Sequence, residues 1–349
     1  MSDPGRGRPN PAGRRAAAGR PAFPRPGGAV TGQPGGGGGR VDGGAEAAVE
    51  RAAAVLGVRA RRGVAVGPLT TYRVGGPAGL FLDATGEADL ALAQEAVSSS
   101  GVPVLVLGKG SNLLVSDAGF PGLVVSLGEP FASIEVAGDG LVRAGGALSL
   151  PVLARRTVAA GLTGMEWAVG VPGSVGGAVR MNAGGHGSDV SRSLVRCGLI
   201  DLCQGQGREA GPEALAFSYR HSAVAPHQVV TWASFALAPG DRAASEAELA
   251  EIVRWRRENQ PGGQNAGSVF TNPPEDSAGR LVEAAGLKGL RVGSAHVSTK
   301  HANFVQADPK GSADDVWRLV LEVQRLVEER LGVRLAPELR MVGFPVDGP

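Results

Sequence analysis

The sequence predicts an α+β fold in which a polar tail precedes two folded domains. Short helical segments alternate with apolar, strand-like segments from about residue 60 to 235, and a smaller set of helices and strands follows. At 349 residues the chain is long enough for two domains of ordinary size. We place the tail at 1–45, the first domain at 46–240 and the second at 241–349.

Composition and charge distinguish the tail. Residues 1–45 are mainly Gly, Pro, Arg and Ala, which cannot bury enough apolar surface to offset the entropy lost on ordering, so we expect disorder. Residues 1–40 carry +6 (seven Arg and one Asp) of a total of +2, which leaves −4 for the remainder. A mildly acidic folded part argues against a nucleic-acid partner.

Membrane and metal partners are not expected either. No apolar run reaches the roughly 18 residues that span a bilayer, and the Arg-rich start lacks the apolar segment of a secretory signal, which predicts a cytoplasmic protein. The cysteines are Cys197 and Cys203, and without further ligands at metal-site spacing they predict structural thiols and no metal site. The oligomeric state stays open, with a monomer slightly favoured.

Capping and breaker residues define the elements of the first domain. Residues 87–100 predict a helix capped by Thr85, and the apolar run 102–107 predicts a buried strand. Ser149 begins a second helix, which ends before Gly161.

The second domain contains three predicted helices, each beginning at a serine, with two strands between the last two. The helices span 245–259, 277–285 and 312–331, and the strands span 292–297 and 302–306. We interpret the apolar stripe of the last helix as core rather than as a groove for a partner. Its members are Val316, Leu319, Val320, Val323, Leu326 and Val327.

The most unusual segment is 161–187, which holds nine glycines and almost no charge. Glycine inside a helix or strand is destabilising by roughly 0.5–1 kcal/mol relative to alanine, so such a run is typical of backbone that lies close against a ligand. We therefore predict a cofactor cradle. Its candidate residues are Pro172, Gly173, Ser174, Gly176, Gly177, Asn182 and Gly184.

A shorter turn after the strand at 102–107 predicts a second wall of the same site. It has two of the three glycines of a dinucleotide fingerprint, but Leu113 stands where the third is required, which argues against a Rossmann fold. A P-loop sequence does not occur. The backbone N–H groups could bind a diphosphate, although an ordinary turn would look the same. The candidates are Gly108, Gly110, Ser111 and Asn112.

Eight motifs occur in a fixed order. They are TYRVGGPA, LGKGSNLLVSD, GVPGSVGGAVRMNAGG, YRHS, NAGSVFTNP, AGRLVEAAGLKG, VSTKHANF and LAPELRMVG. Together they cover about residues 65–344 and resemble the UDP-N-acetylenolpyruvoylglucosamine reductases, flavoenzymes of peptidoglycan precursor synthesis. The chain resembles the branch of that family that lacks an extra tyrosine loop.

The resemblance implies a two-lobed FAD-binding domain of the vanillyl-alcohol-oxidase type and a smaller C-terminal α+β domain that closes over the substrate. FAD would be bound noncovalently and NADPH would donate the hydride. The substrate would be a nucleotide sugar, UDP-N-acetylglucosamine enolpyruvate, reduced to UDP-N-acetylmuramate. His186 would be a loop residue rather than a covalent attachment point for flavin.

Three catalytic residues carry over from the resemblance. Ser268 in NAGSVFTNP matches the proton donor, Arg220 in YRHS the active-site cation, and Glu338 in LAPELRMVG the active-site acid. Hydride addition at C3 pushes negative charge onto C2 and the carboxylate, which a guanidinium can neutralise and a positioned hydroxyl can protonate. A free carboxylate would repel that charge, so Glu338 should be protonated or paired.

The other candidates are substrate contacts. They are Tyr219, Arg256, Arg257, Asn265 and Lys288, and the three cations among them could hold the UDP diphosphate. Thr271 stands where the family often has a lysine, so no phosphate contact is assigned to it.

Two other functions stay open. One is an oxidase of small alcohols or sugars on the same flavin scaffold, which turnover with oxygen would reveal. The other is an anion-binding protein that acts through its Arg-Gly tail, which deletion of residues 1–45 would separate from an enzyme.

Overall fold

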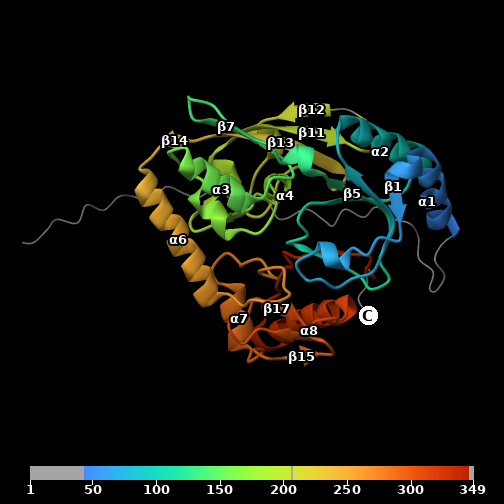
Figure 1. The fold of residues 1–349 in the computed structure, drawn as a ribbon. Helices are drawn as coiled ribbons and strands as arrows, with labels where there is room; N and C mark the ends of the chain where they lie inside the picture. Colours follow the sequence, from blue (N-terminus) through green and yellow to red (C-terminus); the bar gives the residue numbers. More distant parts are fainter. Residues whose placement is uncertain (1–42, 206, 346–349) are drawn as a thin grey trace, which may run out of the picture. The chain divides into compact units, whose positions relative to one another are not determined.

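The computed structural model describes residues 43–205 and 207–345, which form two sheet-containing lobes and a C-terminal region (Figure 1). The segment predicted to be disordered lies outside the described residues, except for 43–45, which begin the first helix. Within the described ranges, no helix is both long and apolar enough to cross a bilayer.

The first lobe is a four-stranded sheet with two helices on one face, in the order β1-β2-β5-β3. β2 and β3 each run parallel to β5, and β1 is antiparallel to β2. Alternate strand residues such as Leu80 and Leu123 pack against the helices. The elements are α1 (Gly43–Leu56), β1 (Ala60–Arg62), β2 (Ala78–Ala84), α2 (Glu87–Ser100), β3 (Val104–Leu107) and β5 (Phe120–Leu127).

The second lobe is an antiparallel five-stranded sheet in the order β12-β11-β13-β7-β6. Its core includes Phe235 of the sheet together with Leu153, Val179 and Ile252 of three helices. The strands are β6 (Ile134–Val136), β7 (Leu141–Gly145), β11 (Leu194–Asp201), β12 (Gly207–Ala210) and β13 (Gln228–Ala236), and the helices are α3 (Leu150–Ala159), α4 (Val175–Met181) and α6 (Arg242–Asn259). Because Ile252 belongs to this core, α6 packs on the second lobe before the chain continues to the C-terminal region (Figure 1).

The C-terminal region packs α7 and α8 against a small antiparallel sheet, β15-β16-β17. Five of the six residues of the predicted apolar stripe on α8 are buried and Leu326 is half-buried, which confirms the interpretation as core. The elements are α7 (Ala278–Ala284), β15 (Arg291–Val292), β16 (Ala295–Val297), β17 (Val305–Ala307) and α8 (Ala313–Leu331).

The chain then returns to the first part of the molecule. β18 (Arg340–Val342) pairs in parallel with β4 (Leu113–Val115), which directly follows the glycine-containing turn. This pairing brings Glu338, two residues before β18, next to the turn, because Asn112 Nδ2 donates a hydrogen bond of 3.1 Å to the Glu338 carbonyl oxygen.

The predicted helices are present, but two capping predictions are wrong, and Ser149 holds the N-cap position of α3 without a capping hydrogen bond from its side chain. Thr85 does not cap α2; its N–H and hydroxyl both donate to Asp89 Oδ2 at 2.8 Å. Helix α6 begins three residues before the predicted Ser245, because Asp241 accepts from the N–H groups of residues 243 and 244. The Ser245 hydroxyl instead donates to the buried Glu166 carboxylate at 2.6 Å.

The predicted strands are shorter than expected. The run 292–297 is divided into β15 and β16 by a turn in which Gly293 has a φ of 52°. The second strand, expected over 302–306, begins only at Val305. In both cases a turn occupies part of the segment that the sequence predicts as strand.

Candidate active site

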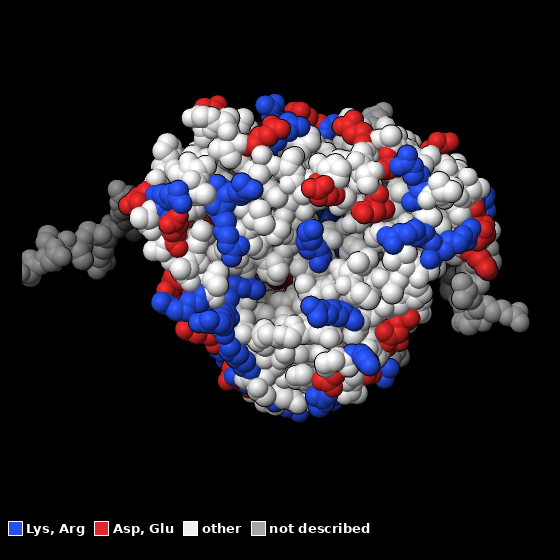
Figure 2. Space-filling view, viewed as in Figure 1, with Lys and Arg blue, Asp and Glu red and all other residues white. Residues whose placement is uncertain are grey.

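A cavity of about 710 Å³ lies where the two lobes and the C-terminal region meet, a size typical of small-molecule sites. Figure 2 shows a hollow of this kind with Lys and Arg side chains around its rim. The lining comes from the turn after β3, the glycine-rich segment, the end of α6, the loop at 265–268 and the approach to β18. These segments are distant in sequence, so the fold assembles the site.

The two predicted glycine walls meet at this cavity. A Cβ placed on Gly108 would lie 2.6 Å from Ser174 Oγ, and one on Gly173 would lie 3.2 Å from Ser111 Oγ. The missing side chains therefore let the two walls pack closely against each other beside the cavity. The predicted cofactor residues that line the cavity are Gly108, Gly110, Ser111, Asn112, Pro172, Gly173, Ser174, Gly177 and Gly184.

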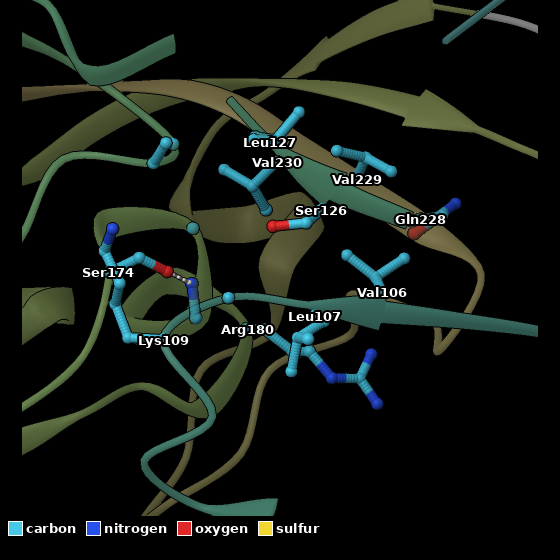
Figure 3. A pocket seen from close by; sticks show the side chains of 15 residues that line it. Val106, Leu107, Lys109, Ser126, Leu127, Ser174, Arg180, Gln228, Val229 and Val230 are labelled. Atoms are coloured by element: carbon cyan, nitrogen blue, oxygen red, sulfur yellow. Dashed lines mark hydrogen bonds between the residues drawn. The ribbon is translucent and has the colours of Figure 1, made fainter. Parts of the chain in front are cut away.

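A narrower pocket of about 80 Å³ shares part of this lining and lies against β3, β5 and β13. Figure 3 shows its apolar walls, with Val106, Leu127 and Val230, and polar side chains that include Ser126 and Gln228. The residues common to both spaces are Val106, Leu107, Gly108, Lys109, Ser174, Gly177 and Arg180. The two spaces adjoin at these shared residues, an arrangement that suits a long ligand with a ring at each end, such as FAD.

At three positions, glycine is required for a reason other than ligand binding. Gly110 has a φ of 59°, and a Cβ there would lie 2.5 Å from the carbonyl oxygen of Leu69. Gly176 and Gly184 face backbone oxygens in the same way, at 3.0 and 2.5 Å. At these positions the missing side chain lets backbone pack on backbone, whatever ligand binds nearby.

Asn182 does not line the cavity. It ends α4 with a φ of 41°, its Nδ2 donates to the Ser218 carbonyl oxygen at 3.0 Å, and its Oδ1 accepts from the Ser191 N–H at 3.0 Å. The amide therefore braces the loop behind the glycine-rich segment, and the structure does not bring it to the predicted cradle.

The three predicted catalytic residues line the same cavity. Arg220 Nε lies 3.0 Å from Glu338 Oε1, but its N–H does not point at an acceptor, so the contact is an ion pair without hydrogen-bond geometry. Burial raises the pKa of Glu338 above its ordinary value, although the Arg220 charge opposes this. The Glu338 carboxyl is thus paired with Arg220, as expected for an acid that must not repel the negative charge of the reaction.

The raised pKa of Glu338 predicts how stability depends on pH. A carboxyl that holds its proton more tightly in the folded protein contributes stability below pH 4.5, and that contribution is lost as the pH rises through the raised pKa. Thermal unfolding of wild type and Glu338→Gln should therefore give a Tm difference (wild type minus variant) that falls as the pH rises from 4.5. The exposed Glu328→Gln is the control, and a difference that grows with pH would contradict this direction.

Ser268 is half-buried and follows Gly267, whose φ is 77°. The residues after it are held by the buried Asn303, whose Oδ1 accepts from the Phe270 N–H at 3.0 Å while its Nδ2 donates to the Phe270 carbonyl at 2.8 Å. The Val269 N–H donates to the Asn303 backbone carbonyl at 2.9 Å. Asn303 therefore positions the Ser268 loop, a role that the VSTKHANF motif contained but that sequence reasoning missed.

Replacing Asn303 with Ala should lower the free energy of unfolding by about 2–4 kcal/mol, because the buried N–H and C=O of Phe270 both lose their partner. Urea denaturation measures the loss. Asn259→Ala is the matched control, since that exposed amide bonds only the carbonyl of Trp255 at the end of α6. If Asn303→Ala lowers the free energy of unfolding no more than Asn259→Ala does, Asn303 does not position the Ser268 loop.

The five predicted substrate contacts divide into two groups. Arg256 and Asn265 line the cavity. Tyr219, Arg257 and Lys288 do not: Tyr219 is 60% exposed, Arg257 is exposed, and Lys288 pairs with Glu283 at 2.7 Å on the surface.

Sequence reasoning missed three cations in the cavity, Lys109, Arg180 and Arg340. Burial, together with the Arg340 charge, lowers the pKa of Arg180 to about 10. Arg180 Nη1 donates to the Val224 carbonyl at 3.0 Å, which fixes the guanidinium. Two neighbouring cations in one cavity favour an anionic ligand. Arg180 lies inside the glycine-rich motif and Arg340 two residues after Glu338, so their position in the motifs was the available signal.

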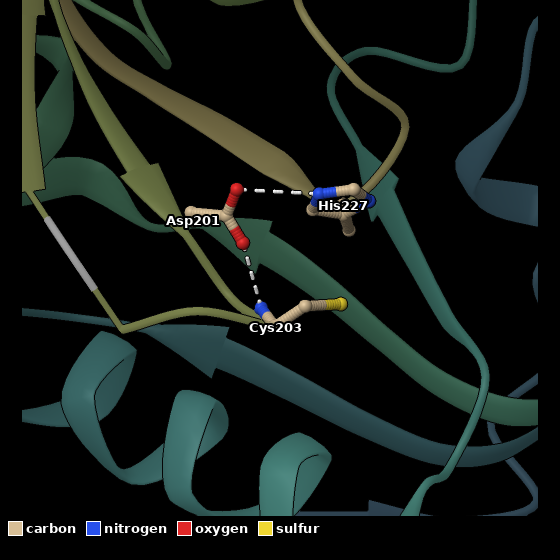
Figure 4. A group of neighbouring side chains, drawn as sticks. All are labelled: Asp201, Cys203 and His227. Atoms are coloured by element: carbon tan, nitrogen blue, oxygen red, sulfur yellow. Dashed lines mark hydrogen bonds and ion pairs between the residues drawn. The ribbon is translucent and has the colours of Figure 1, made fainter.

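Away from the cavity, Asp201, Cys203 and His227 lie together, with potential ligand atoms within 4.8 Å of one another (Figure 4). Asp201 Oδ1 already accepts from the N–H groups of Cys203 and residue 204 at 2.9 Å, and its Oδ2 lies 3.2 Å from His227 Nε2. The carboxylate thus closes the turn after β11. Cys197 is buried, as a structural thiol should be, whereas Cys203 is exposed and the prediction is wrong for it.

Comparisons with known proteins agree with this geometry. A protein-family model described as an FAD binding domain matches residues 78–210, and one described as the C-terminal domain of UDP-N-acetylenolpyruvoylglucosamine reductase matches residues 259–342. The UDP-N-acetylenolpyruvoylglucosamine reductase of Rubrobacter xylanophilus is 44% identical over 278 residues, which cover 79% of this chain and 93% of that protein. The one from Paramagnetospirillum magneticum is 44% identical over 282 residues, covering 80% and 91%.

A solved structure of a reductase of the same name is also similar to this chain. The crystal structure of UDP-N-acetylenolpyruvylglucosamine reductase from Thermus caldophilus matches with a TM-score of 0.71 at 37% identity, and the match covers 81% of this chain and 99% of that one. Together with the FAD-binding family model, it confirms the predicted fold class: a two-lobed FAD-binding domain of the vanillyl-alcohol-oxidase type followed by a smaller α+β domain.

Proposed function

The chain belongs to the UDP-N-acetylenolpyruvoylglucosamine reductase family, and from this premise we propose that Arg220, Ser268 and Glu338 are its catalytic residues. The protein is an FAD-containing oxidoreductase that uses NADPH to reduce UDP-N-acetylglucosamine enolpyruvate to UDP-N-acetylmuramate. The observation that supports the catalytic assignment is that these three side chains line one cavity between the two glycine walls.

FAD, when bound, supplies the hydride chemistry. We propose that residues 46–240 hold it noncovalently through the lining glycines and Ser111, Ser174 and Asn112, and that residues 241–349 bind the nucleotide sugar. Arg180 and Arg340 supply positive charge for an anionic group of either ligand. Asn182 then acts indirectly, through the loop that it braces.

The chain's own residues handle charge and protons. Arg220, with its planar fork, is placed to bind the enolpyruvyl carboxylate, and Glu338 limits where that guanidinium can lie. The Ser268 hydroxyl donates a proton to C2 once hydride has reached C3. Burial raises the pKa of Glu338, and its ion pair with Arg220 offsets the repulsion that a lone carboxylate would exert on the developing negative charge. We further propose that the protein acts as a monomer in the cytoplasm, in cell-wall precursor synthesis.

An absorbance spectrum tests the function. Purified protein should be yellow, NADPH should bleach it without air, and the enolpyruvyl substrate should then restore the colour. A preparation that stays colourless after reconstitution with FAD would contradict the function. Rapid reoxidation by oxygen alone, with turnover of small alcohols or sugars, would favour an oxidase instead.

Removal of residues 1–42 tests the anion-binding alternative. The cut leaves α1 intact, because that helix begins at Gly43. We expect unchanged flavin content and unchanged reductase turnover, since the proposed cofactor-binding and catalytic residues all lie between Gly108 and Glu338. Loss of turnover with retained flavin would assign the segment a part in the activity.

A further inference from the structure

One aromatic residue of the cavity has no part in the proposed chemistry. Trp255, on α6, lines the cavity and remains 42% exposed. Exposed indole surface is unfavourable in water and is stabilised when another ring covers it. The residue therefore suits a contact that forms when a ligand binds.

His186 fixes the position of that indole. It lies in the turn between β9 (Gly184–Gly185) and β10 (Ser188–Asp189), and the two ring centroids are 5.3 Å apart with the planes at 86°. His186 has a φ of 50°, an uncommon backbone conformation for a residue with a side chain. The contact joins α6 to the glycine-rich wall and orients the Trp255 ring.

A cation lies next to Trp255. Arg256 lines the cavity, burial lowers its pKa, and none of the ion pairs among the described residues includes it. A Cβ placed on Gly170 would lie 3.1 Å from Arg256 Cδ and 3.5 Å from His186 Nε2, so Arg256 and His186 pack against the same glycine. A partly buried guanidinium without a carboxylate is a site for a ligand anion.

The third residue beside Trp255 and Arg256 is Gln260, whose side-chain oxygen accepts no hydrogen bond from the described residues. Gln260 follows α6, four residues after Arg256, and lines the cavity. Its Oε1 is buried and has no hydrogen-bond partner in the described part of the chain. Leaving a buried acceptor unpaired is costly, so a ligand N–H at this position would be stabilising.

We propose that Trp255, Arg256 and Gln260 form a subsite for the base and phosphate of a nucleotide. The indole stacks on the base, the guanidinium binds a phosphate, and the Gln260 carbonyl accepts an N–H from the base edge. This deepens the proposed function and rests on it, because the substrate carries UDP and the hydride donor is also a nucleotide. Trp255 has a positioning role and takes no part in bond making.

Calorimetric titration of the oxidised holoenzyme tests the subsite, with UDP and NADP+ as separate probes. Trp255→Ala should raise the Kd of at least one probe about 10-fold, the range of a base-aromatic stack. Trp255→Phe should restore most of the affinity, while Trp255→Leu, which keeps apolar bulk without a ring, should not. Val253→Ala is the control, because Val253 is 44% exposed on the same helix and does not line the cavity.

The outcomes separate the two possible ligands. A higher Kd for UDP alone assigns the subsite to uracil, and a higher Kd for NADP+ alone assigns it to the hydride donor. If the Kd of both probes rises, the two ligands use the subsite in turn. The subsite would be overturned if Trp255→Leu and Trp255→Phe bound the probes with equal affinity. It would also be overturned if every Trp255 variant bound both probes with a Kd within about twofold of the wild-type value. Wild-type holoenzyme that binds neither probe would overturn the proposed function itself.

Discussion

Replacing Ser268 with Ala is expected to slow the reoxidation of reduced flavin by the enolpyruvyl substrate by about 10²–10⁴-fold, the contribution of a well-placed general acid. Ser268 lines the cavity with Arg220 and Glu338, and its hydroxyl is the group that we propose protonates C2. Reduction of the flavin by NADPH should remain near the wild-type rate, because that half-reaction needs no proton at C2. Stopped-flow absorbance measures the two half-reactions separately.

Thr271→Ala is the matched control for Ser268→Ala. The Thr271 hydroxyl donates to the Ala336 carbonyl at 3.2 Å and does not line the cavity, so its loss should leave both half-reactions unchanged. Equal slowing of both half-reactions in Ser268→Ala would show that the loop has moved, and it would reject the role of proton donor.

Replacing Arg220 with Lys should lower kcat by about 10²-fold, the effect of removing one fixed donor from an anionic transition state. A lysine keeps the charge but offers a compact ammonium in place of a planar fork, so it cannot make two parallel bonds to a carboxylate. The substitution also replaces the partner of Glu338, whose Oε1 lies 3.0 Å from Arg220 Nε. Steady-state kinetics with the enolpyruvyl substrate measure the loss.

Arg257→Lys is the comparison for Arg220→Lys, since Arg257 is exposed and does not line the cavity. Its kcat should match the wild type. Wild-type kcat in Arg220→Lys would mean that the site needs only a positive charge there, and bidentate binding of the carboxylate would be rejected.

The sequence predicts local structure best where the responsible residues are neighbours. The helix at α8 follows from apolar spacing and from Ser312, whose hydroxyl accepts the Asp315 N–H at 3.2 Å. The start of α6 is wrong because two capping signals, Asp241 and Ser245, lie four residues apart, and only the fold shows that Ser245 is taken by Glu166. A choice between local signals that depends on a distant partner cannot be made from the sequence.

The same limit applies to the site. The glycine walls follow from contiguous runs of residues, whereas Arg220, Ser268 and Glu338 follow from the resemblance to the family, and all three of these side chains line one cavity. Arg180 and Asn303 were missed because their roles depend on contacts across the fold, with Val224 and Phe270.

The pairing of β18 with β4 makes the site depend on two strands that are synthesised far apart in time, because Leu113 pairs with Arg340. A nascent chain that has emerged only as far as α8 lacks both Glu338 and the strand that follows it, and therefore holds an open half-site. Deletion of residues 340–342 should likewise leave the reaction chamber unclosed on the side of β4.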